Sequence, residues 1–298
     1  MPGRRVTICS GQASPRGEAT VSICPKGISQ FLKYSLFSGK TSVILTSATL
    51  SQSGDTLEKQ YAYLSRSLGY RGEYMERQAS PFDYDNHTMM YIAKDVPYYN
   101  HNNREAYLEA AYKELLRLCN VTDGRTLVLF FGQRGYEVHS QKKLSAEKLK
   151  WALHMQREGS SQDGVIAEFR ASKGLLLSTG VFWEGVNIEG ADLSHLIVFR
   201  LPFPVPADPV YEYKAAQVAN PLMEVYVPDM LLRLRQGTGR LIRSETDLGV
   251  LSILDSRLSA GARNPYREQV LAALPFTKVT EDFGVLEKFV RAKGIQRG

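Results

Sequence analysis

The side chains best suited to chemistry lie within residues 226–244, which contain the pattern Gln-x-x-Gly-Arg-x-x-Arg. Gln236, Arg240 and Arg243 stand four and three residues apart, so at about 100° per residue they share one face of a helix. Pro228 fits the first turn of that helix, where its missing N–H costs nothing. The sequence therefore predicts a helix that presents an amide and two guanidiniums on one face. The opposite face is a largely apolar stripe of Leu231, Leu234, Thr238, Leu241 and Ile242.

Two interpretations of this stretch fit its residue types. Arginine suits a phosphoryl group in transfer, because its planar guanidinium is always charged and its donors form a rigid fork. Gly237 and Gly239 would each cost a helix about 1 kcal/mol relative to alanine, which favours close approach by another backbone or a ligand. The alternative is a surface helix with a solvated basic face. The fixed spacing of the pattern favours the phosphoryl-binding interpretation.

The elements around this helix alternate between strand and helix. Apolar runs predict strands at 88–93, 126–131, 174–178, 196–199 and 248–254, and helical spacing predicts helices at 57–68, 107–118, 145–156 and 163–169. Such alternation is typical of an α/β fold with a parallel sheet covered by helices on both faces. Ligands bind beyond the carboxyl ends of the strands in open α/β sheets, where the polar residues after Phe131, Ser178 and Leu254 lie.

The first 50 residues follow a different pattern. A short strand at 21–24 and a short helix at 28–36 precede a buried-strand run at 42–46, which leads into the sequence S-A-T-L (47–50). A polar break at 50–55 predicts a domain boundary that separates 1–52 from 53–298. The sequence G-K-T (39–41) has the ending of a phosphate-binding P-loop. That interpretation is rejected, because Tyr34 stands where the motif needs a glycine and a strand follows instead of a helix.

Composition narrows the class of protein. The 298 residues carry a formal charge of +6, and the pI of about 9.1 is compatible with a polyanionic partner. Cys9, Cys24 and Cys119 are far apart, and the five histidines show no metal-ligand spacing, so we expect neither a metal site nor an iron–sulfur cluster. The odd number of cysteines favours a reducing cytosol, hence a cytoplasmic protein. No window approaches the roughly 18 apolar residues of a membrane span, so no membrane partner is expected.

Three stretches, taken in order, resemble helicase motifs III, V and VI. They are T-S-A-T-L (46–50), S-T-G-V-F-W-E-G-V (178–186) and Q-G-T-G-R-L-I-R-S (236–244). Supporting stretches are L-V-L-F (127–130), S-P-F-D-Y (80–84), L-P-F-P-V-P-A-D-P (201–209) and L-D-S-R (254–257). The set resembles the DinG/XPD-type superfamily-two DNA helicases, bacterial DinG above all, from about Val21 to Leu274.

The resemblance implies a second RecA-like motor domain at 53–298, preceded by the tail of a first motor domain at 1–52. In such helicases ATP, with magnesium, lies between the two motor domains. The first domain supplies the P-loop lysine and the magnesium-binding acidic pair, which this sequence lacks. The second supplies arginine fingers, which are here Arg240 and Arg243, with Gln236 beside them.

The resemblance also implies roles for the other matched positions. Ser47, Ala48 and Thr49 would couple the nucleotide state to the DNA, although alone they also fit a strand that ends in small hydroxyl residues. Ser178 and Thr179 would hydrogen-bond the DNA backbone, with Arg134 as a further contact. The residues expected to approach the nucleotide are Glu184, Gly185, Asn187 and Gly239. Trp183 fits packing better than base stacking.

Two departures from the family pattern weaken particular assignments. Asn187 stands where the family usually has aspartate, which loses a charge that could pair with a finger arginine. Residues 132–134 read Gly-Gln-Arg where the family usually has Thr/Ser-Ser-Tyr, which puts the Arg134 contact in doubt.

The sequence is therefore interpreted as the C-terminal motor half of an ATP-dependent 5′ to 3′ DNA helicase. Its expected partners are single-stranded DNA and an N-terminal helicase half, in the same chain or a separate one. Alone it should hydrolyse little or no ATP. The alternatives are a non-enzymatic RecA-like module that binds nucleic acid or a partner protein, and half of an RNA-directed helicase.

Overall fold

The computed structural model describes the chain apart from residues 1–6, 14–18, 26, 40, 48, 52–53, 75–79, 132–139, 141, 156–160, 180–187, 189 and 296–298. It contains two compact units. The first unit combines Met1–Ala79 with Phe203–Met230, and the second combines Ser80–Pro202 with Leu231–Gly298. The predicted boundary between residues 52 and 53 concerns which motor domain each segment belongs to, and it stays a prediction.

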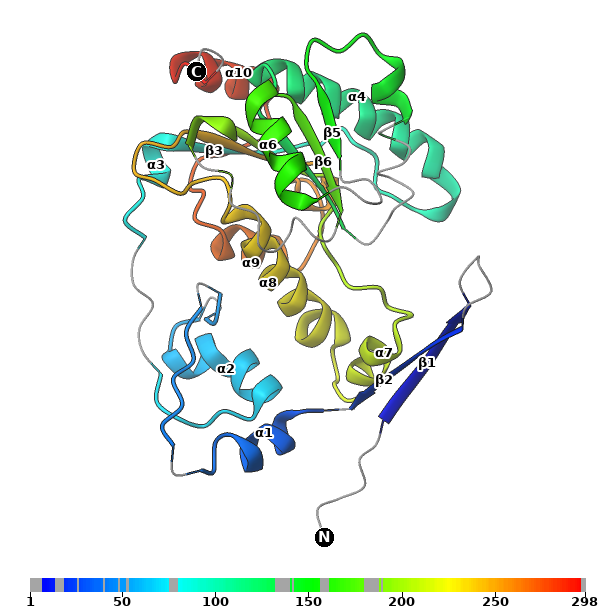
Figure 1. Cartoon of the computed structure of the whole chain (residues 1–298), viewed down its shortest axis with the longest axis vertical. Helices are drawn as coiled ribbons and strands as arrows, with labels where there is room; N and C mark the ends of the chain where they lie inside the picture. The colour runs from blue at the N-terminus through cyan, green and yellow to red at the C-terminus, as the bar shows by residue number, and fades with distance from the viewer. Residues whose placement is uncertain are drawn as a thin grey trace. The chain divides into compact units, whose positions relative to one another are not determined.

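The described part of the second unit is built on a seven-stranded parallel sheet (Figure 1). Every described strand pair in it is parallel, and the strand order is β5-β6-β4-β7-β8-β3-β9. This confirms the predicted fold class and five predicted strands. The strands are β3 (Thr88–Ile92), β4 (Thr126–Phe130), β5 (Leu153–Met155), β6 (Leu175–Thr179), β7 (His195–Val198), β8 (Gly249–Ile253) and β9 (Val279–Thr280).

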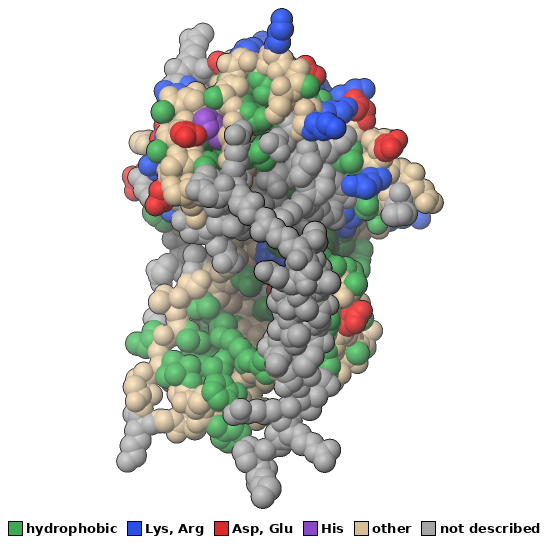
Figure 2. Space-filling view, turned by 45° about the vertical axis from the view of Figure 1, so that its right-hand side comes forward, with side chains coloured by type: hydrophobic (Ala, Val, Ile, Leu, Met, Phe, Trp, Pro, Cys, Tyr) green, Lys and Arg blue, Asp and Glu red, His purple; other side chains and the backbone are tan. Residues whose placement is uncertain are grey.

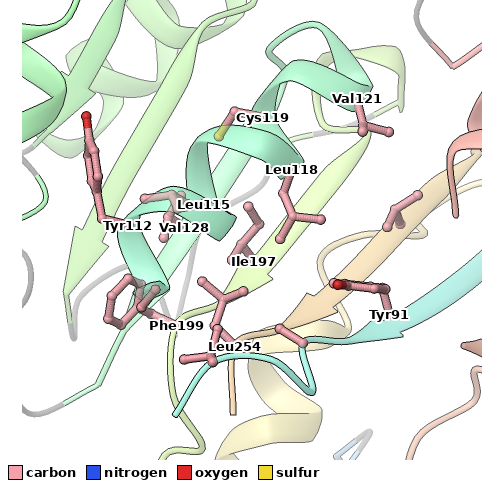
Figure 3. Packing of buried hydrophobic residues seen from close by; sticks show 14 of the residues in the cluster. Tyr91, Tyr112, Leu115, Leu118, Cys119, Val121, Val128, Ile197, Phe199 and Leu254 are labelled. Atoms are coloured by element: carbon pink, nitrogen blue, oxygen red, sulfur yellow. The ribbon is translucent and has the colours of Figure 1, made fainter. Parts of the chain in front are cut away.

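Helices cover both faces of this sheet. Crossovers between parallel strands are right-handed as a rule, and with this strand order the rule puts α4 (Arg104–Thr122) on one face and α6 (Gln162–Ser172), α8 (Val227–Thr238) and α9 (Arg267–Ala273) on the other. The helix α10 (Phe283–Ala292) packs beside α4. Neighbouring strand residues point to opposite faces, and Leu127, Val128 and Leu129 are all completely buried. Figure 3 shows Leu115 and Leu118 of α4 close to Val128 and Ile197.

The predicted helix at 145–156 is wrong: among its described residues only 145 and 146 are helical, and residues 153–155 form the edge strand β5. Leu153 and Met155 pair with Leu175 and Leu177 of β6, and Leu175 N–H donates to the Ala152 carbonyl at 2.8 Å. The edge of β6 would otherwise leave backbone groups unpaired, and these strand pairs satisfy them. Trp151 anchors the approach, since its Nε1–H donates to Asp123 Oδ1 at 3.0 Å.

The first unit contains smaller elements. An antiparallel hairpin joins β1 (Thr7–Ala13) to β2 (Ala19–Pro25), and the helices are α1 (Ser29–Ser35), α2 (Leu57–Leu68) and α7 (Pro209–Ala215). Asp229 ties three of its segments together. Its two carboxylate oxygens accept hydrogen bonds from the hydroxyl of Tyr63 at 3.3 Å and that of Tyr211 at 2.5 Å.

The predicted buried strand at 42–46 is wrong, because the structure has no strand there and Ile44 is 88% exposed. A strand is stable only when neighbouring strands satisfy its backbone groups. No strand in the described part of the chain pairs with this run. The predicted strand at 21–24 and the predicted helix at 28–36 are confirmed as β2 and α1.

Pro228 lies in the first turn of α8, as predicted, but that turn is not a free helix start. A π-helical segment, Leu222–Tyr226, leads without a break into α8, so Pro228 has helical turns on both sides. Proline cannot donate to the carbonyl four residues earlier, here that of Glu224. Arg66 Nη2 donates to that carbonyl instead, at 3.0 Å. The described part of the chain also contains the short helix α3 (Tyr84–His87) and 3₁₀ turns at His101–Asn103, Gly190–Asp192 and Ser256–Leu258.

Candidate functional site

The segment with the Gln-x-x-Gly-Arg-x-x-Arg pattern begins in α8 and ends outside it. Gln236 lies half-buried in the last turn, and the helix stops at Thr238. Gly239 N–H still bonds to the Arg235 carbonyl at 3.0 Å, but Leu241 N–H bonds to Thr238, only three residues back, at 3.2 Å. The tighter bond turns the chain out of the helix. The two glycines of the pattern weaken helix propensity at this point.

The prediction that Gln236, Arg240 and Arg243 share one helical face is therefore wrong. Arg240 lies in the turn after the helix and is 9% exposed, whereas Arg243 lies in irregular chain and is exposed. Of the two predicted finger arginines, only Arg243 presents its side chain to solvent. The nucleotide contact assigned to Gly239 stays a prediction, as do the roles of all three polar residues.

The apolar stripe opposite these residues is buried as predicted, with every member at 9% exposure or less. Its last part lies on the start of β8. A Cβ atom at Gly249 would stand 2.6 Å from Leu241 Cγ, so only glycine at this position leaves room for the Leu241 side chain. The stripe thus holds the chain after α8 against the sheet.

A carboxylate that the sequence analysis missed fixes the Arg243 segment. Asp247 is 6% exposed, and its Oδ2 accepts the N–H of Arg243 at 2.8 Å and that of Ser244 at 2.9 Å. Its Oδ1 accepts the Ser244 hydroxyl at 2.6 Å. The spacing Ser-x-x-Asp at 244–247 signals such a side-chain-to-backbone turn and could have predicted it. Asp247 therefore holds the backbone of Arg243, an exposed residue, in place.

The predicted DNA contacts lie at the other end of the sheet. Ser178 and Thr179 are the last residues of β6, opposite Leu129 and Phe130 of β4. Ser178 is buried at 2% exposure, and its contact with DNA stays a prediction. Arg134, Glu184, Gly185 and Asn187 lie outside the described residues.

The Arg243–Asp247 turn and the Ser178–Thr179 pair lie at opposite ends of the parallel strands. A Cβ atom at Gly190 would lie 3.9 Å from Asp247 Oδ1, which places the Asp247 turn beside the chain that enters β7 at its amino end. Ser178 lies at the carboxyl end of β6. Strands of five residues span about 17 Å, which sets the scale of the separation.

The predicted coupling segment lies in the first unit. Ser47 is exposed, and Thr49 N–H donates to Ser47 Oγ at 3.3 Å, with the two hydroxyl oxygens 3.2 Å apart. This arrangement is a local side-chain turn. Ala48 lies outside the described residues, and the coupling role stays a prediction.

A buried ion pair orders the carboxyl end of β8. Arg257 Nε and Nη2 donate to Asp255 Oδ1 and Oδ2 at 2.8 and 2.6 Å, and the Leu201 N–H donates to Oδ2 at 3.1 Å. Burial lowers the pKa of Arg257, but the hydrogen bonds and charge of Asp255 outweigh burial and raise it above its ordinary value. Arg257 is therefore a permanent cation whose charge is neutralised within the protein.

Metal-ligating residues do not gather in the described part of the chain, which contains no group of three or more His, Cys, Asp or Glu side chains able to hold a metal ion. Burial raises the pKa of the Cys119 thiol to about 12, which keeps it protonated. Among the described helices, none is long and apolar enough to cross a membrane.

Comparison with known protein families gives one decisive match. A family model described as "Helicase C-terminal domain" matches residues 115–277, more than half of the chain. The chain belongs to this helicase family. The match runs from Leu115 within α4 to Thr277 after α9, and it includes both the Arg243 segment and the Asp255–Arg257 pair.

Two curated relatives support the assignment. The chain is 30% identical over 279 residues to the ATP-dependent DNA helicase YoaA of Escherichia coli, which covers 91% of this chain and 41% of YoaA. It is 31% identical over 262 residues to a Bacillus subtilis protein named 3'-5' exonuclease DinG, covering 85% of this chain and 27% of that protein. The chain thus spans less than half the length of the relatives it matches. The predicted resemblance to DinG-type helicases is confirmed.

A solved structure described as an XPD helicase has the same fold. It superimposes with a TM-score of 0.65 at 19% identity, over 89% of this chain and 47% of that one. The helicase C-terminal domain is therefore RecA-like, with the parallel sheet and flanking helices that the strand–helix alternation predicted.

Proposed function

We propose that this helicase C-terminal domain is the second motor half of an ATP-dependent DNA helicase that moves 5′ to 3′ along single-stranded DNA. The single observation that carries the proposal is the Arg243 segment. It combines the family match with an arginine that is exposed as a residue and whose backbone is held by a buried carboxylate. A positioned arginine at a motor interface is what a transferring phosphoryl group requires.

In this proposal Arg243 acts as the arginine finger on ATP held by a first motor domain. ATP with magnesium would supply the transferred phosphoryl group and its leaving group. Arg243 fits such a role better than Arg240, because Arg240 is 9% exposed and surrounded by the protein. Arg240 instead fits a positioning role behind the segment, and Gln236 lies half-buried in the last turn of α8.

The test is ATP hydrolysis by this chain joined to the P-loop-bearing motor half of a DinG-type helicase. We expect single-stranded DNA to stimulate turnover, and Arg243→Ala to lower it by about 10³ or more. Arg291→Ala is the matched control, because Arg291 is an exposed arginine of α10 that lies 3.8 Å from Glu287. The chain alone should show almost no ATPase activity.

Two outcomes would contradict the proposal. Robust DNA-stimulated hydrolysis by the 298 residues alone would overturn the assignment as one half of a motor. Equal turnover in the Arg243→Ala and Arg291→Ala enzymes would show that Arg243 is a solvated surface side chain.

A further inference from the structure

We propose that a cavity at the carboxyl end of β8 binds one nucleotide of single-stranded DNA, with the base on Tyr98 and the phosphate on Arg263 and Ser256. The cavity has a volume of about 480 Å³, within the range of small-ligand sites, and it is open to solvent. This inference rests on the proposed function, since it names a binding residue set for the same DNA. None of its residues belongs to the DNA contacts predicted from the sequence.

The position of the cavity fits a DNA strand that runs past the carboxyl ends of the β-strands. Ser256 and Arg257 directly follow β8, so the cavity lies at the carboxyl edge that also carries Ser178 and Thr179 of β6. Three strand spacings separate β6 from β8, which is about 14 Å. Ligands bind at this edge in open α/β sheets.

The charges around the cavity leave one arginine available. Arg257 is committed to Asp255 through two side-chain hydrogen bonds. Arg267 is committed as well, because its Nε donates to the Leu258 carbonyl at 2.8 Å and its Nη1 to Glu268 at 2.7 Å. Arg263 is exposed, and within the described residues it has no ion-pair partner. A phosphate would therefore meet an uncompensated guanidinium at this point.

The cavity also offers an aromatic surface and a fixed frame. Tyr98 is 58% exposed although it lines the cavity, so its ring is open to stacking by a base. Asn264 holds the loop: its Nδ2 donates to the Arg257 carbonyl at 2.7 Å, and its Oδ1 accepts Tyr266 N–H at 3.0 Å. Stacking and phosphate contacts without base-edge readout predict binding that is indifferent to sequence.

The test is fluorescence anisotropy of the intact chain with a labelled oligothymidylate at several salt concentrations. We expect Tyr98→Ala to weaken binding about tenfold and Tyr98→Phe to retain it, because the ring and not the hydroxyl stacks. Arg263→Ala should weaken binding and reduce the slope of log K against log salt by about 0.7, and Arg263→Lys should restore the slope. Lys288→Ala is the control: it removes an exposed cation from α10, away from the cavity, and should change neither quantity.

The outcomes separate this inference from the proposed function. Binding by the unmodified chain together with wild-type behaviour of Tyr98→Ala and Arg263→Ala would overturn the nucleotide site and leave the helicase proposal standing. No binding of single-stranded DNA at low salt would overturn both. Binding of thymidine monophosphate that Tyr98→Ala and Arg263→Ala abolish, with no loss of oligonucleotide affinity in the same variants, would overturn the DNA site and assign the cavity to a free mononucleotide. Thermal unfolding of each variant checks that the fold is intact.

Discussion

The helices that pack on the sheet of the second unit and the helices of the α1–α2 segment in the first unit (residues 28–74) have similar sequence patterns. They differ in how much of their apolar surface is buried. In α4, most apolar side chains are buried against the strands. In α1 and α2, no residue is buried, and Phe31 and Tyr34 are 62% and 66% exposed. The tyrosines of the α1–α2 segment contact one another instead, and Tyr61 and Tyr74 stack at 4.9 Å.

This difference shows that apolar periodicity specifies a helix without specifying what covers it. Most helical stability comes from tertiary packing of the apolar face. On the face drawn in Figure 2, apolar side chains gather over the first unit, while most of the lysine and arginine side chains lie over the second. We therefore expect the sheet to respond to core substitutions and the α1–α2 segment to respond mainly to local changes.

The largest contrast should come from one substitution made in both regions. Phe169→Ala in α6 removes a completely buried ring and should cost about 3–5 kcal/mol of unfolding free energy, whereas Phe31→Ala should stay within about 0.5 kcal/mol of wild type. Urea unfolding followed by far-ultraviolet circular dichroism measures this, because helices of both units contribute to that signal. A loss of similar size in both variants would show that α1 is packed as tightly as α6.

A smaller effect is expected where the sheet has no room for a methyl group. Gly249→Ala would bring a Cβ within 2.6 Å of Leu241 and should destabilise the second unit by about 1–3 kcal/mol. Gly261→Ala is the matched control, since nothing described lies within 4 Å of its Cβ position. The double variant Gly249→Ala, Leu241→Ala should recover part of the loss relative to the sum of the single changes. Strict additivity would mean that the two residues do not collide.

Acid should weaken the sheet unit through His195. Burial lowers its pKa from 6.5 to about 3, while its Nδ1 and Nε2 lie 3.1 and 2.8 Å from the hydroxyls of Thr122 and Ser252. The unfolded chain takes up a proton below about pH 6.5 and the folded chain does not, so stability falls as the pH falls from 6.5 toward 3. The slope should approach about 1.4 kcal/mol per pH unit.

Urea unfolding between pH 7 and 5 measures this slope, and His195→Gln should flatten it whatever its effect on stability at pH 7. The first unit contains no histidine, so no such slope arises from it in this range. An unchanged slope in His195→Gln would assign the acid sensitivity to other groups.

The smallest expected loss of stability concerns the α1–α2 segment, where a side-chain cap stabilises a helix that has no buried residue. The Thr56 side chain accepts the Lys59 N–H at 3.3 Å and caps α2. Thr56→Ala should lower the stability of α2 by about 1 kcal/mol. Hydrogen exchange of the α2 amides measures this, with α6, capped by Ser161, as an internal control in the same sample. Equal acceleration in α2 and α6 would mean that the change acts globally.

The sequence by itself determined the parallel sheet, the buried stripe that runs along α8 and beyond it, and the family. Apolar runs and helical apolar spacing predicted these elements, and the ordered motifs have fixed spacing. It also placed polar residues correctly at the carboxyl ends of β6 and β8. These properties depend on residues close together in the chain.

Only the tertiary structure decided where α8 ends, which arginine is exposed and which strand forms at 153–155. Each depends on a partner distant in sequence. Gly249 admits Leu241, and the edge of β6 recruits β5. Ile44 shows the converse: its run is apolar enough for a strand, but no described strand lies beside it, so it stays 88% exposed. Backbone hydrogen bonds and close packing need both partners in place, and a local pattern specifies only one of them.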